Sequence, residues 1–484
     1  MKLLFAASEV VPLAKTGGLA DVAAALPAAL TQAGVALRVV MPAYLGVRER
    51  LGASTAIGSL HVRGEDFTVF EGRLPRSATP VWLLDCPALY AREGDPYHDA
   101  QHVPWPDNAW RFGCYAEAVA RLALGEAGGW HADVVHCNDW QSGLVPALLS
   151  LQPARPRTVF TIHNLAYAGL FSRKDFDRLD LPPAWWSPSG VEFYGDWSML
   201  KAGLVHSDAI TTVSPTYARE ILTPEFGSGF DGLLRSLSGK LKGILNGIDE
   251  ETWNPASDPL IARKYSLRDV VEGKRANRRA LQEELGLVPD DAAVLIGLVG
   301  RLTDQKGMDL VLAALPELLK LPIQIALLAS GDKLQEAAFE RAALAAPDRI
   351  GLRIAYDERL AHRIEAGADV FLMPSRFEPC GLNQMYSQRY GTIPIVRRVG
   401  GLADTVVDAT PEALGAGTAT GVVFDNATVD GLLSAVRQAV RLVRDPYTRA
   451  ALQGAGMSRD FSWQSSAQQY LELYARDGAQ SCSQ

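Results

Sequence analysis

Residues 2–42 read KLLFAASEVVPLAKTGGLADVAAALPAALTQAGVALRVVMP, and this stretch decides the fold. Its apolar runs and helical spacing predict a buried strand at 2–8, a glycine-containing loop, a helix from about Leu19 to Ala33 and a second strand at 36–42. The same order returns within residues 294–331, as VLIGLVG, RLTDQKG, MDLVLAALPELLK and IQIALLASG. Strands that alternate with helices in this way indicate a doubly wound parallel sheet in each half of the chain.

Other apolar runs extend both sheets. They read VWLLDC, DVVHC and RTVFTIH in the first half, and RIGLRIAY, DVFLMPS, TIPIVRRV and GVVFD in the second. Cores tend to split beyond about 250–300 residues, so a chain of 484 residues is expected to hold two large domains. Asn-Gly and Asn-Pro turns between Asn246 and Pro255 mark the junction. We therefore expect an α/β protein with Rossmann-like domains at 1–245 and 246–460, followed by a helical segment at 461–484.

Composition and charge exclude several classes of protein. Lys and Arg number 47 against 55 Asp and Glu, a net charge of −8, whereas nucleic-acid backbones demand clustered positive charge. No run of about 20 apolar residues is available to span a membrane, and Glu9 interrupts the apolar start too early for a signal peptide. The five cysteines are scattered and form no C-x-x-C pair, which fits a reducing cytoplasm and gives no structural zinc signature.

Two loops that follow strands carry cations, and ligands of doubly wound sheets bind beyond such strand ends. Lys15, Gly17 and Gly18 precede the first helix, where glycines admit a ligand close to the backbone and the helix N-terminus favours negative charge. The alternative is a glycine-rich turn with a surface lysine. Arg301 and Lys306, five residues apart, can converge on one diphosphate in the second half, unless their loop is merely solvated.

Glu378 stands in the segment FEPCGL, at a junction between a strand and a helix. A carboxylate held there can bond sugar hydroxyls or stabilise positive charge that develops at an anomeric carbon, or it can be an ordinary charge of a first helical turn. The amides of Gly381, Leu382 and Asn383 are expected to act as helix N-terminal donors. Cys380 has no nearby His or second Cys, so thiol catalysis is not expected there.

Polar residues also follow two strands in the first half. His163 and Asn164 stand at the end of RTVFTIHN, where a histidine faces a ligand cleft or plays a structural role. Asp139 follows DVVHC and either binds sugar hydroxyls or caps the next helix, and the cap is the simpler interpretation. His136, Asp139 and His163 lack a recognised ligand spacing, so we expect no metal.

Taken together, these motifs resemble the bacterial glycogen synthase and plant starch synthase family. The match covers nearly the whole chain in the family's order and is carried by KTGGL (15–19), HCNDW (136–140), FTIHN (160–164), NGID (246–249), RL and KG (301–307), EPCG (378–381) and GGLADT (400–405). The resemblance implies a GT-B fold and retaining transfer of glucose from ADP-glucose to the non-reducing 4-hydroxyl of an α-1,4-glucan such as glycogen. It also implies that the C-terminal helix returns to the first domain.

The resemblance also implies roles for individual residues. Arg301, Lys306 and Lys15 would neutralise the leaving diphosphate, His163 would act near the anomeric centre, and Glu378 would bind glucose hydroxyls. Asp139 would orient the donor sugar or the acceptor, and Tyr356 would stack on adenine. Further nucleotide-sugar contacts are expected from Gly17, Gly18, Cys380, Gly381, Leu382 and Asn383, and acceptor or sugar contacts from Tyr97, Asn164 and Asn246. No cofactor is expected, because ADP-glucose is a substrate, and the protein is expected to be a monomer or a weak homo-oligomer.

Two departures from the family pattern are Ala168, where glutamine is usual, and Asn383, where threonine is common. Neither touches a charged position. Two rival functions remain: a GT-B-fold isomerase of nucleotide sugars that uses no acceptor, and a non-catalytic glucan-binding protein. The aromatic-rich segment from Tyr97 to Trp110 favours an acceptor groove over the isomerase, unless these rings belong to the core. A glucan phosphorylase is excluded, because it would need a Schiff-base lysine for pyridoxal phosphate in a much longer chain.

Overall fold

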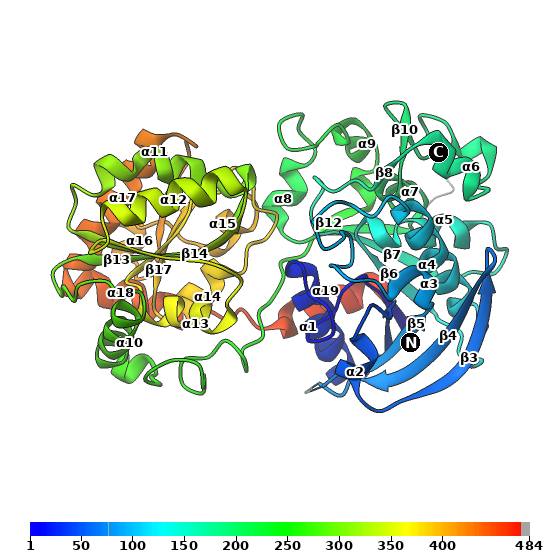
Figure 1. The fold of residues 1–484 in the computed structure, drawn as a ribbon, viewed down its shortest axis with the longest axis horizontal. Helices are drawn as coiled ribbons and strands as arrows, with labels where there is room; N and C mark the ends of the chain where they lie inside the picture. The colour runs from blue at the N-terminus through cyan, green and yellow to red at the C-terminus, as the bar shows by residue number, and fades with distance from the viewer. Residues whose placement is uncertain (76, 476–484) are drawn as a thin grey trace. The chain divides into compact units, whose positions relative to one another are not determined.

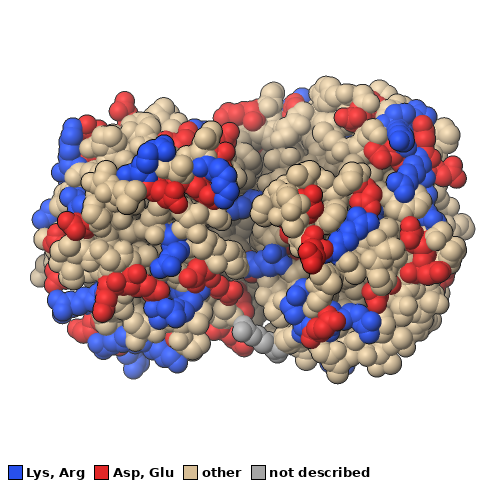
Figure 2. All heavy atoms as spheres, viewed as in Figure 1, with Lys and Arg blue, Asp and Glu red and all other residues tan. Residues whose placement is uncertain are grey.

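The computed structural model describes residues 1–75 and 77–475, which form two α/β units (Figure 1). The first unit comprises Met1–Val213, Ala218–Gly247 and the helix α19 (Trp463–Ala475). The second comprises Ser214–Tyr217 and Ile248–Ser462. Among the described residues, no helix is both long and apolar enough to cross a bilayer. Figure 2 shows acidic and basic side chains interspersed over the visible face of each unit, without the clustered positive charge that nucleic-acid backbones require.

The first unit is built on a nine-stranded sheet in the order β12-β11-β7-β6-β1-β2-β5-β4-β3. The first seven strands in this order run parallel, as predicted, and apart from the half-buried edge strand β12 their short apolar runs are buried on both faces, as expected when helices cover a parallel sheet. They are β1 (Lys2–Ala6), β2 (Ala36–Pro42), β5 (Pro80–Asp85), β6 (Val134–Asn138), β7 (Arg157–Ile162), β11 (Ala209–Thr212) and β12 (Leu241–Gly243).

An antiparallel hairpin that was not predicted from the sequence extends this sheet. Its strands are β3 (Ser54–Val62) and β4 (Glu65–Arg73), and β4 pairs with β5. The two residues between them, Arg63 and Gly64, both have positive φ (52° and 87°), which gives a tight hairpin turn. Arginine at the first turn position is not a recognisable hairpin signal, and the exposed strand β3 carries little apolar alternation. A small separate sheet, β8-β10-β9, joins Leu170–Phe171, Asp196–Ser198 and Glu192–Phe193.

The helices of the first unit are mostly short. They are α1 (Gly18–Gln32), α2 (Val47–Leu51), α3 (Pro87–Tyr90), α4 (Asn108–Ala123), α5 (Leu144–Ser150), α6 (Arg173–Arg178), α7 (Met199–His206), α8 (Pro215–Glu220, shared with the second unit), α9 (Asp231–Ser236) and α19. Helix α19 packs against α1, and its Tyr474 hydroxyl lies 2.7 Å from Nδ1 of the buried His136. Segments from both ends of the chain therefore complete one core.

The second unit holds a six-stranded parallel sheet in the order β15-β14-β13-β16-β17-β18, which confirms the second Rossmann-like prediction. Its strands are β13 (Val294–Leu302), β14 (Ile323–Gly331), β15 (Ile350–Ile354), β16 (Val370–Met373), β17 (Ile393–Arg397) and β18 (Val422–Phe424). Its helices are α10 (Val270–Glu284), α11 (Met308–Leu318), α12 (Lys333–Ala345), α13 (Glu358–Gly367), α14 (Asn383–Arg389), α15 (Gly400–Thr405), α16 (Pro411–Gly415), α17 (Val429–Arg444) and α18 (Pro446–Met457).

Each sheet has one position where the strand order reverses. In the first unit β1 lies between β2 and β6, and in the second β13 lies between β14 and β16. The connections after neighbouring strands leave toward opposite faces at such a point and open a crevice at the carboxyl ends of the strands. The loops that leave these points are 7–17 and 139–143 in the first unit, and 303–307 and 374–382 in the second. These loops contain half of the predicted site residues.

A substitution at Gly143 tests how tightly the loop at 139–143 is packed. A methyl group on Gly143 would overlap the backbone carbonyl oxygen of Met199, at the start of α7. We expect Gly143→Ala to destabilise the first unit by about 1–3 kcal/mol or more, because backbone cannot yield as a side chain would. Urea unfolding measures the change, with Gly239→Ala as the control, since no atom lies within 4 Å of a methyl there. Equal stability of both variants would contradict the described packing.

Candidate active site

The loop after β1 folds around the carboxylate of Glu9, a residue whose role the sequence did not reveal. Glu9 is 3% exposed and accepts hydrogen bonds from the backbone N–H and the Oγ1 of Thr16, and from Gly17 N at 3.3 Å. The hydroxyl of Tyr97 donates to the same carboxylate at 2.9 Å. Burial raises the pKa of Glu9, and these hydrogen bonds lower it in part. The signal in the sequence that could have identified Glu9 was its position as an acidic residue directly after the predicted buried strand at 2–8.

The two predicted phosphate-binding glycines lie at the start of α1. A methyl group on either Gly17 or Gly18 would meet no described atom within 4 Å, and neither residue has positive φ. Internal packing therefore does not require glycine at either position. Lys15 precedes them, with a side chain 34% exposed and its Nζ 2.8 Å from Asp21 Oδ1.

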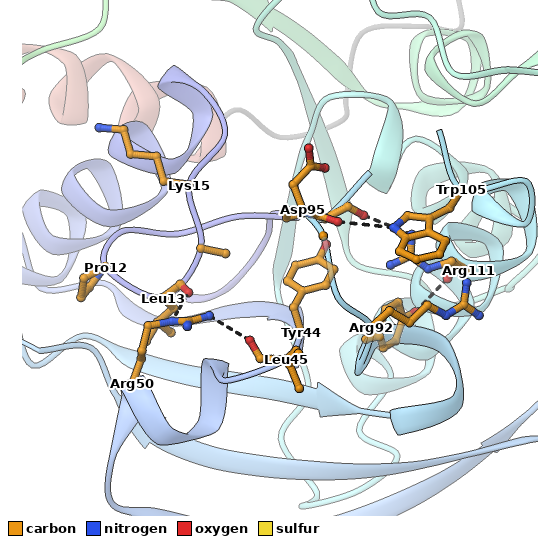
Figure 3. Close-up of a pocket in the computed structure, with 14 residues that line it drawn as sticks. Pro12, Leu13, Lys15, Tyr44, Leu45, Arg50, Arg92, Asp95, Trp105 and Arg111 are labelled. Carbon is orange, nitrogen blue, oxygen red and sulfur yellow. Dashed lines mark hydrogen bonds between the residues drawn. The ribbon is translucent and has the colours of Figure 1, made fainter. Parts of the chain in front are cut away.

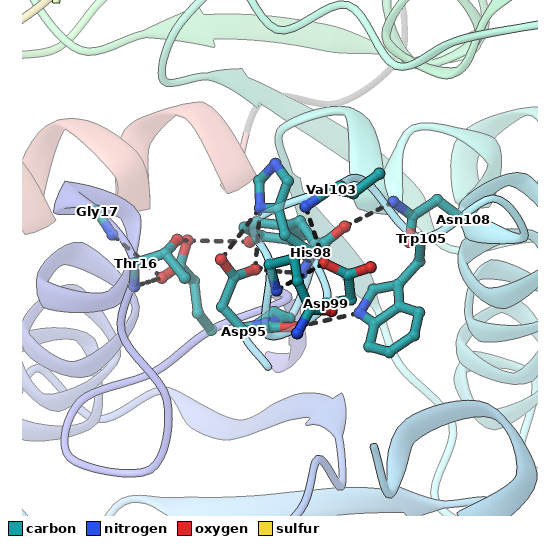
Figure 4. Close-up of polar contacts among 12 residues, drawn as sticks. Thr16, Gly17, Asp95, His98, Asp99, Val103, Trp105 and Asn108 are labelled. Atoms are coloured by element: carbon teal, nitrogen blue, oxygen red, sulfur yellow. Dashed lines mark hydrogen bonds and ion pairs between the residues drawn. The ribbon is translucent and has the colours of Figure 1, made fainter. Parts of the chain in front are cut away.

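The aromatic-rich segment after Gly94 lies beside this loop, with its aromatic rings half-buried and residues 100–104 exposed. Figure 4 shows Thr16 and Gly17 beside the turn formed by Asp95, His98 and Asp99. Asp95 Oδ1 accepts hydrogen bonds from the backbone N–H groups of Tyr97 and His98, at 2.7 and 2.8 Å. The ring of Tyr97 lies 6.0 Å from that of Phe112 and 6.2 Å from that of Trp140. Tyr97 is thus half-buried beside these rings, and its hydroxyl binds Glu9.

Asp139 links two loops, and the prediction that it caps the following helix is wrong. Its side chain makes no cap with Trp140–Ser142, and its Oδ1 accepts hydrogen bonds from His163 N at 2.7 Å and Asn164 N at 3.4 Å. Its backbone has φ of 55°, a left-handed value that is uncommon outside glycine. This backbone turns the carboxylate toward the loop after β7. Burial raises the pKa of Asp139 to about 7, although the two backbone N–H groups lower it.

His163 is held as a neutral imidazole in one orientation. Its Nε2 lies 2.9 Å from Oδ1 of Asn138, and the amide nitrogen of Asn138 donates to Ala6 O at 3.0 Å. Because the amide oxygen can only accept, Nε2 carries the proton. Burial lowers the pKa of His163 to about 3. The neighbouring Asn164 accepts a hydrogen bond from Ala166 N at 3.1 Å, which shapes the turn after β7.

Lys306 and Glu378 form an ion pair in the second unit. Their Nζ and Oε2 atoms lie 2.6 Å apart, and Ser375 Oγ donates to the same oxygen at 2.9 Å. Glu378 is 5% exposed, which does not fit the alternative of an ordinary first-turn charge. Gly307 allows this approach, because it has φ of 65° and a methyl there would overlap the carbonyl oxygen of Pro374. The two loops at the strand-order reversal are thereby joined.

Arg301 differs from Lys306 in having no side-chain partner among the residues that the structure describes. It lies within β13, paired with Ser330, and not in the predicted loop, because β14 continues alongside it. Its side chain is exposed, and it makes no hydrogen bond or ion pair with any residue in the described part of the chain. A guanidinium placed at the carboxyl end of a central strand is thus available to an anion.

The remaining predicted residues of the second unit follow β15 and β16. Cys380 is buried, and Gly381 has φ of 71°. Leu382 and Asn383 begin α14, whose first turn no side chain caps, while Nδ2 of Asn383 donates to Val299 O at 3.0 Å. Tyr356 follows β15 and is 73% exposed. In the first unit, Asn246 is buried, and its Oδ1 has no hydrogen-bond partner among residues 1–75 and 77–475.

Comparisons with known proteins agree with this arrangement. Residues 2–236 match the starch synthase catalytic domain and residues 280–453 match glycosyl transferases group 1. Glycogen synthase 1 of Methylococcus capsulatus is 55% identical, covering 98% of this chain and 96% of the relative, and glycogen synthase 2 of Nitrosococcus oceani is 49% identical with the same coverage. The catalytic domain of starch synthase IV from Arabidopsis thaliana, bound to ADP and acarbose, superposes with a TM-score of 0.90 at 33% identity, covering 99% of both chains.

Two parallel-sheet units of these kinds define a retaining glycosyltransferase of the GT-B fold. The chain belongs to the glycogen synthase family. The resemblance drawn from the motifs and the predicted fold class are both confirmed. Within the described residues, no group of three His, Cys, Asp or Glu side chains is placed to hold a metal ion.

The raised pKa of Asp139 gives a test based on pH. The unfolded carboxyl loses its proton near 3.8 and the folded one near 7, so ionisation between these values destabilises the folded state as pH rises. We expect Asp139→Asn, which keeps an acceptor oxygen, to gain stability relative to the unchanged protein across this window. Urea unfolding over the window measures the difference, and Asp177→Asn on the exposed face of α6 is the control. Parallel pH profiles for Asp139→Asn and the unchanged protein would refute the assignment.

Proposed function

We propose that the chain transfers glucose from ADP-glucose to the non-reducing 4-hydroxyl of an α-1,4-glucan, with retention of configuration and release of ADP. The observation that carries the proposal is the Arg301 guanidinium at the end of β13, which has no partner within residues 1–75 and 77–475 and lies on the strand that leads into the loop of the Lys306–Glu378 pair. A diphosphate needs such fixed cations, and a sugar needs a buried carboxylate acceptor. Neither requirement would apply to a protein that only binds glucan.

The proposed reaction breaks the bond between the anomeric carbon and the diphosphate oxygen, whose electron pair leaves with ADP. The acceptor's 4-hydroxyl attacks the same face, and its proton passes to the departing diphosphate, so the α configuration is retained. Arg301 and Lys306 stabilise the charge that grows on the leaving group, and Lys15 is proposed as a further cation for it. Gly17 and Gly18 admit the diphosphate close to the backbone.

Glu378 and His163 are proposed to act on the glucosyl unit. Glu378 keeps a negative charge beside Lys306 and accepts hydrogen bonds from glucose hydroxyls. His163 is neutral, so it can bond the sugar near the anomeric centre without placing a positive charge against the developing oxocarbenium ion. Asp139 positions His163 and Asn164 through their backbone N–H groups.

Tyr356 and the acceptor residues complete the proposal. Tyr356 offers an exposed ring for adenine, and Asn246 holds a buried amide oxygen that lacks a partner in the described part of the chain. The enzyme is proposed to need no metal or cofactor and to work in the cytoplasm as a monomer or weak homo-oligomer. The buried thiols of Cys86, Cys114 and Cys137, which form no disulfide with any cysteine in the described part of the chain, support a reducing compartment.

A donor panel tests the proposed activity. With glycogen as acceptor, ADP-glucose should support release of ADP and incorporation of glucose well above UDP-glucose, and omission of glycogen should abolish incorporation. EDTA should leave the rate unchanged, because side chains and backbone amides supply the positive charge that a metal ion would otherwise provide. Turnover of the nucleotide sugar without an acceptor would favour the isomerase, and loss of activity in EDTA that magnesium or manganese restores would contradict the metal-free mechanism.

Substitution of the cations tests the diphosphate assignment. We expect Arg301→Ala and Lys306→Ala each to lower kcat by two to three decades, the scale of about 3–4 kcal/mol for one preorganised donor. Lys320→Ala, which removes an exposed lysine paired with Glu317 on the far end of α11, is the matched control. Steady-state kinetics with ADP-glucose measures the effect, and near-normal kcat in both variants would remove the assignment.

A further inference from the structure

A polar cavity of about 340 Å³ lies in the first unit, next to the loop that carries Lys15. Its walls come from residues 12–15, from residues 44–50 before and within α2, from the turn at 90–96, and from Trp105 and Arg111 before and within α4. Figure 3 shows Tyr44 at its centre, with Leu13, Lys15 and Arg50 on one side and Arg92, Trp105 and Arg111 on the other. The proposed transfer reaction assigns no role to Tyr44, Arg50 or Arg111.

Tyr44 carries a buried hydroxyl without a partner. The residue is 8% exposed, and its Oη makes no hydrogen bond with any described residue. Burial raises the pKa of Tyr44, so the phenol keeps its proton and remains a donor. Buried hydroxyls in folded proteins nearly always have a partner, and leaving one without a partner destabilises the fold. A group that enters the cavity can supply that partner.

Arg111 carries a buried positive charge without a carboxylate. The residue is 1% exposed. Its Nε donates to Leu89 O at 2.8 Å, and its Nη1 donates to Pro96 O at 3.1 Å and to Asn108 Oδ1 at 2.7 Å, all of them neutral acceptors. Nη2 bonds to no residue in the described part of the chain. A buried guanidinium is normally paired with an anion, so the missing partner is a second sign of a ligand.

The other charges of the cavity do not supply that anion. Arg50 donates only to backbone, from Nε to Leu13 O at 2.7 Å and from Nη2 to Leu45 O at 3.1 Å. Arg92 is neutralised by a two-pronged contact with Asp107, at 2.8 Å for each pair of atoms. Asp95, the carboxylate in the lining, accepts hydrogen bonds from backbone N–H groups and from His98 Nδ1 at 3.0 Å. The cavity therefore retains excess positive charge.

We infer that this cavity binds a phosphate group, with Arg50, Arg111 and the Tyr44 hydroxyl as donors. A tetrahedral phosphate accepts hydrogen bonds in several directions, which suits two guanidinium groups on opposite walls and a phenol at the centre. The volume leaves room for a sugar attached to the phosphate, against the indole of Trp105. The loop of Lys15 forms one wall, so occupancy acts on donor binding. This last consequence rests on the proposed function, whereas the binding itself does not.

Calorimetric titration of the full chain tests the site, with orthophosphate and glucose 1-phosphate as separate ligands at constant ionic strength. Both titrations are repeated at saturating ADP, which occupies the proposed donor site. Because Arg111 supports the backbone of two segments, the variants are Arg50→Gln and Tyr44→Phe, each checked for unchanged thermal unfolding. Arg48→Gln is the matched control, since Arg48 lies on the same helix but pairs with Asp85.

We expect phosphate to bind both with and without ADP. Binding should be about tenfold weaker in Arg50→Gln, because one charge-assisted contact is lost, and several-fold weaker in Tyr44→Phe. Arg48→Gln should bind as the unchanged protein does. Glucose 1-phosphate that binds at least as tightly as orthophosphate identifies a sugar phosphate, and weaker binding identifies the free anion. Absence of binding, loss of binding when ADP is present, or equal affinity in all three variants would overturn the inference. The KM for the donor is a separate measurement. If this KM does not change when phosphate occupies the cavity, only the proposed effect of the cavity on donor binding is rejected.

Discussion

Parallel pairing of strands is the constraint on which the rest of this structure depends. Because the strands of each central sheet point the same way, their carboxyl ends meet on one edge, and the loops that leave them gather there. At β1 and β13, where the strand order reverses, neighbouring loops leave toward opposite faces of the sheet. A crevice therefore opens where these loops begin. Lys15 and Asp139 are 124 residues apart in the sequence, and Arg301 and Glu378 are 77 apart, yet each follows or ends a strand at such an edge.

Buried charge at these edges is organised by specific partners. Glu9 gathers the loop that begins α1, Asp139 joins the loop after β6 to the loop after β7, and Glu378 binds Lys306. Each carboxylate replaces lost hydration with hydrogen bonds from one or two neighbouring segments. The strands therefore bring these loops to one edge, and the hydrogen bonds of the buried carboxylates fix the loops there.

The sequence predicted the fold well and the connections between site residues poorly. The strands β1, β2, β13 and β14 follow from short apolar runs, since a parallel strand buried on both faces has that signature. The hairpin β3–β4 does not, because its turn uses an arginine with positive φ. Asp139 and His163 were each found as candidates, but their contact spans 24 residues along the chain, and that of Lys306 with Glu378 spans 72. Such pairs are brought together by the order of the strands in the sheet, and that order cannot be read from the spacing of residues along the chain.

Helix α19 gives the first unit a core drawn from both ends of the described chain. Its Ser466 donates to Leu245 O, and its Tyr474 contacts His136. The residues Ile248–Ser462, which belong to the second unit, precede α19 in the sequence. On a ribosome, which delivers the chain from its N-terminus, the second unit has all of its strands before the first unit has α19. The half that starts synthesis first is thus the half that finishes folding last. Until α19 emerges, the face of α1 that it covers stays open to chaperones and to other nascent chains.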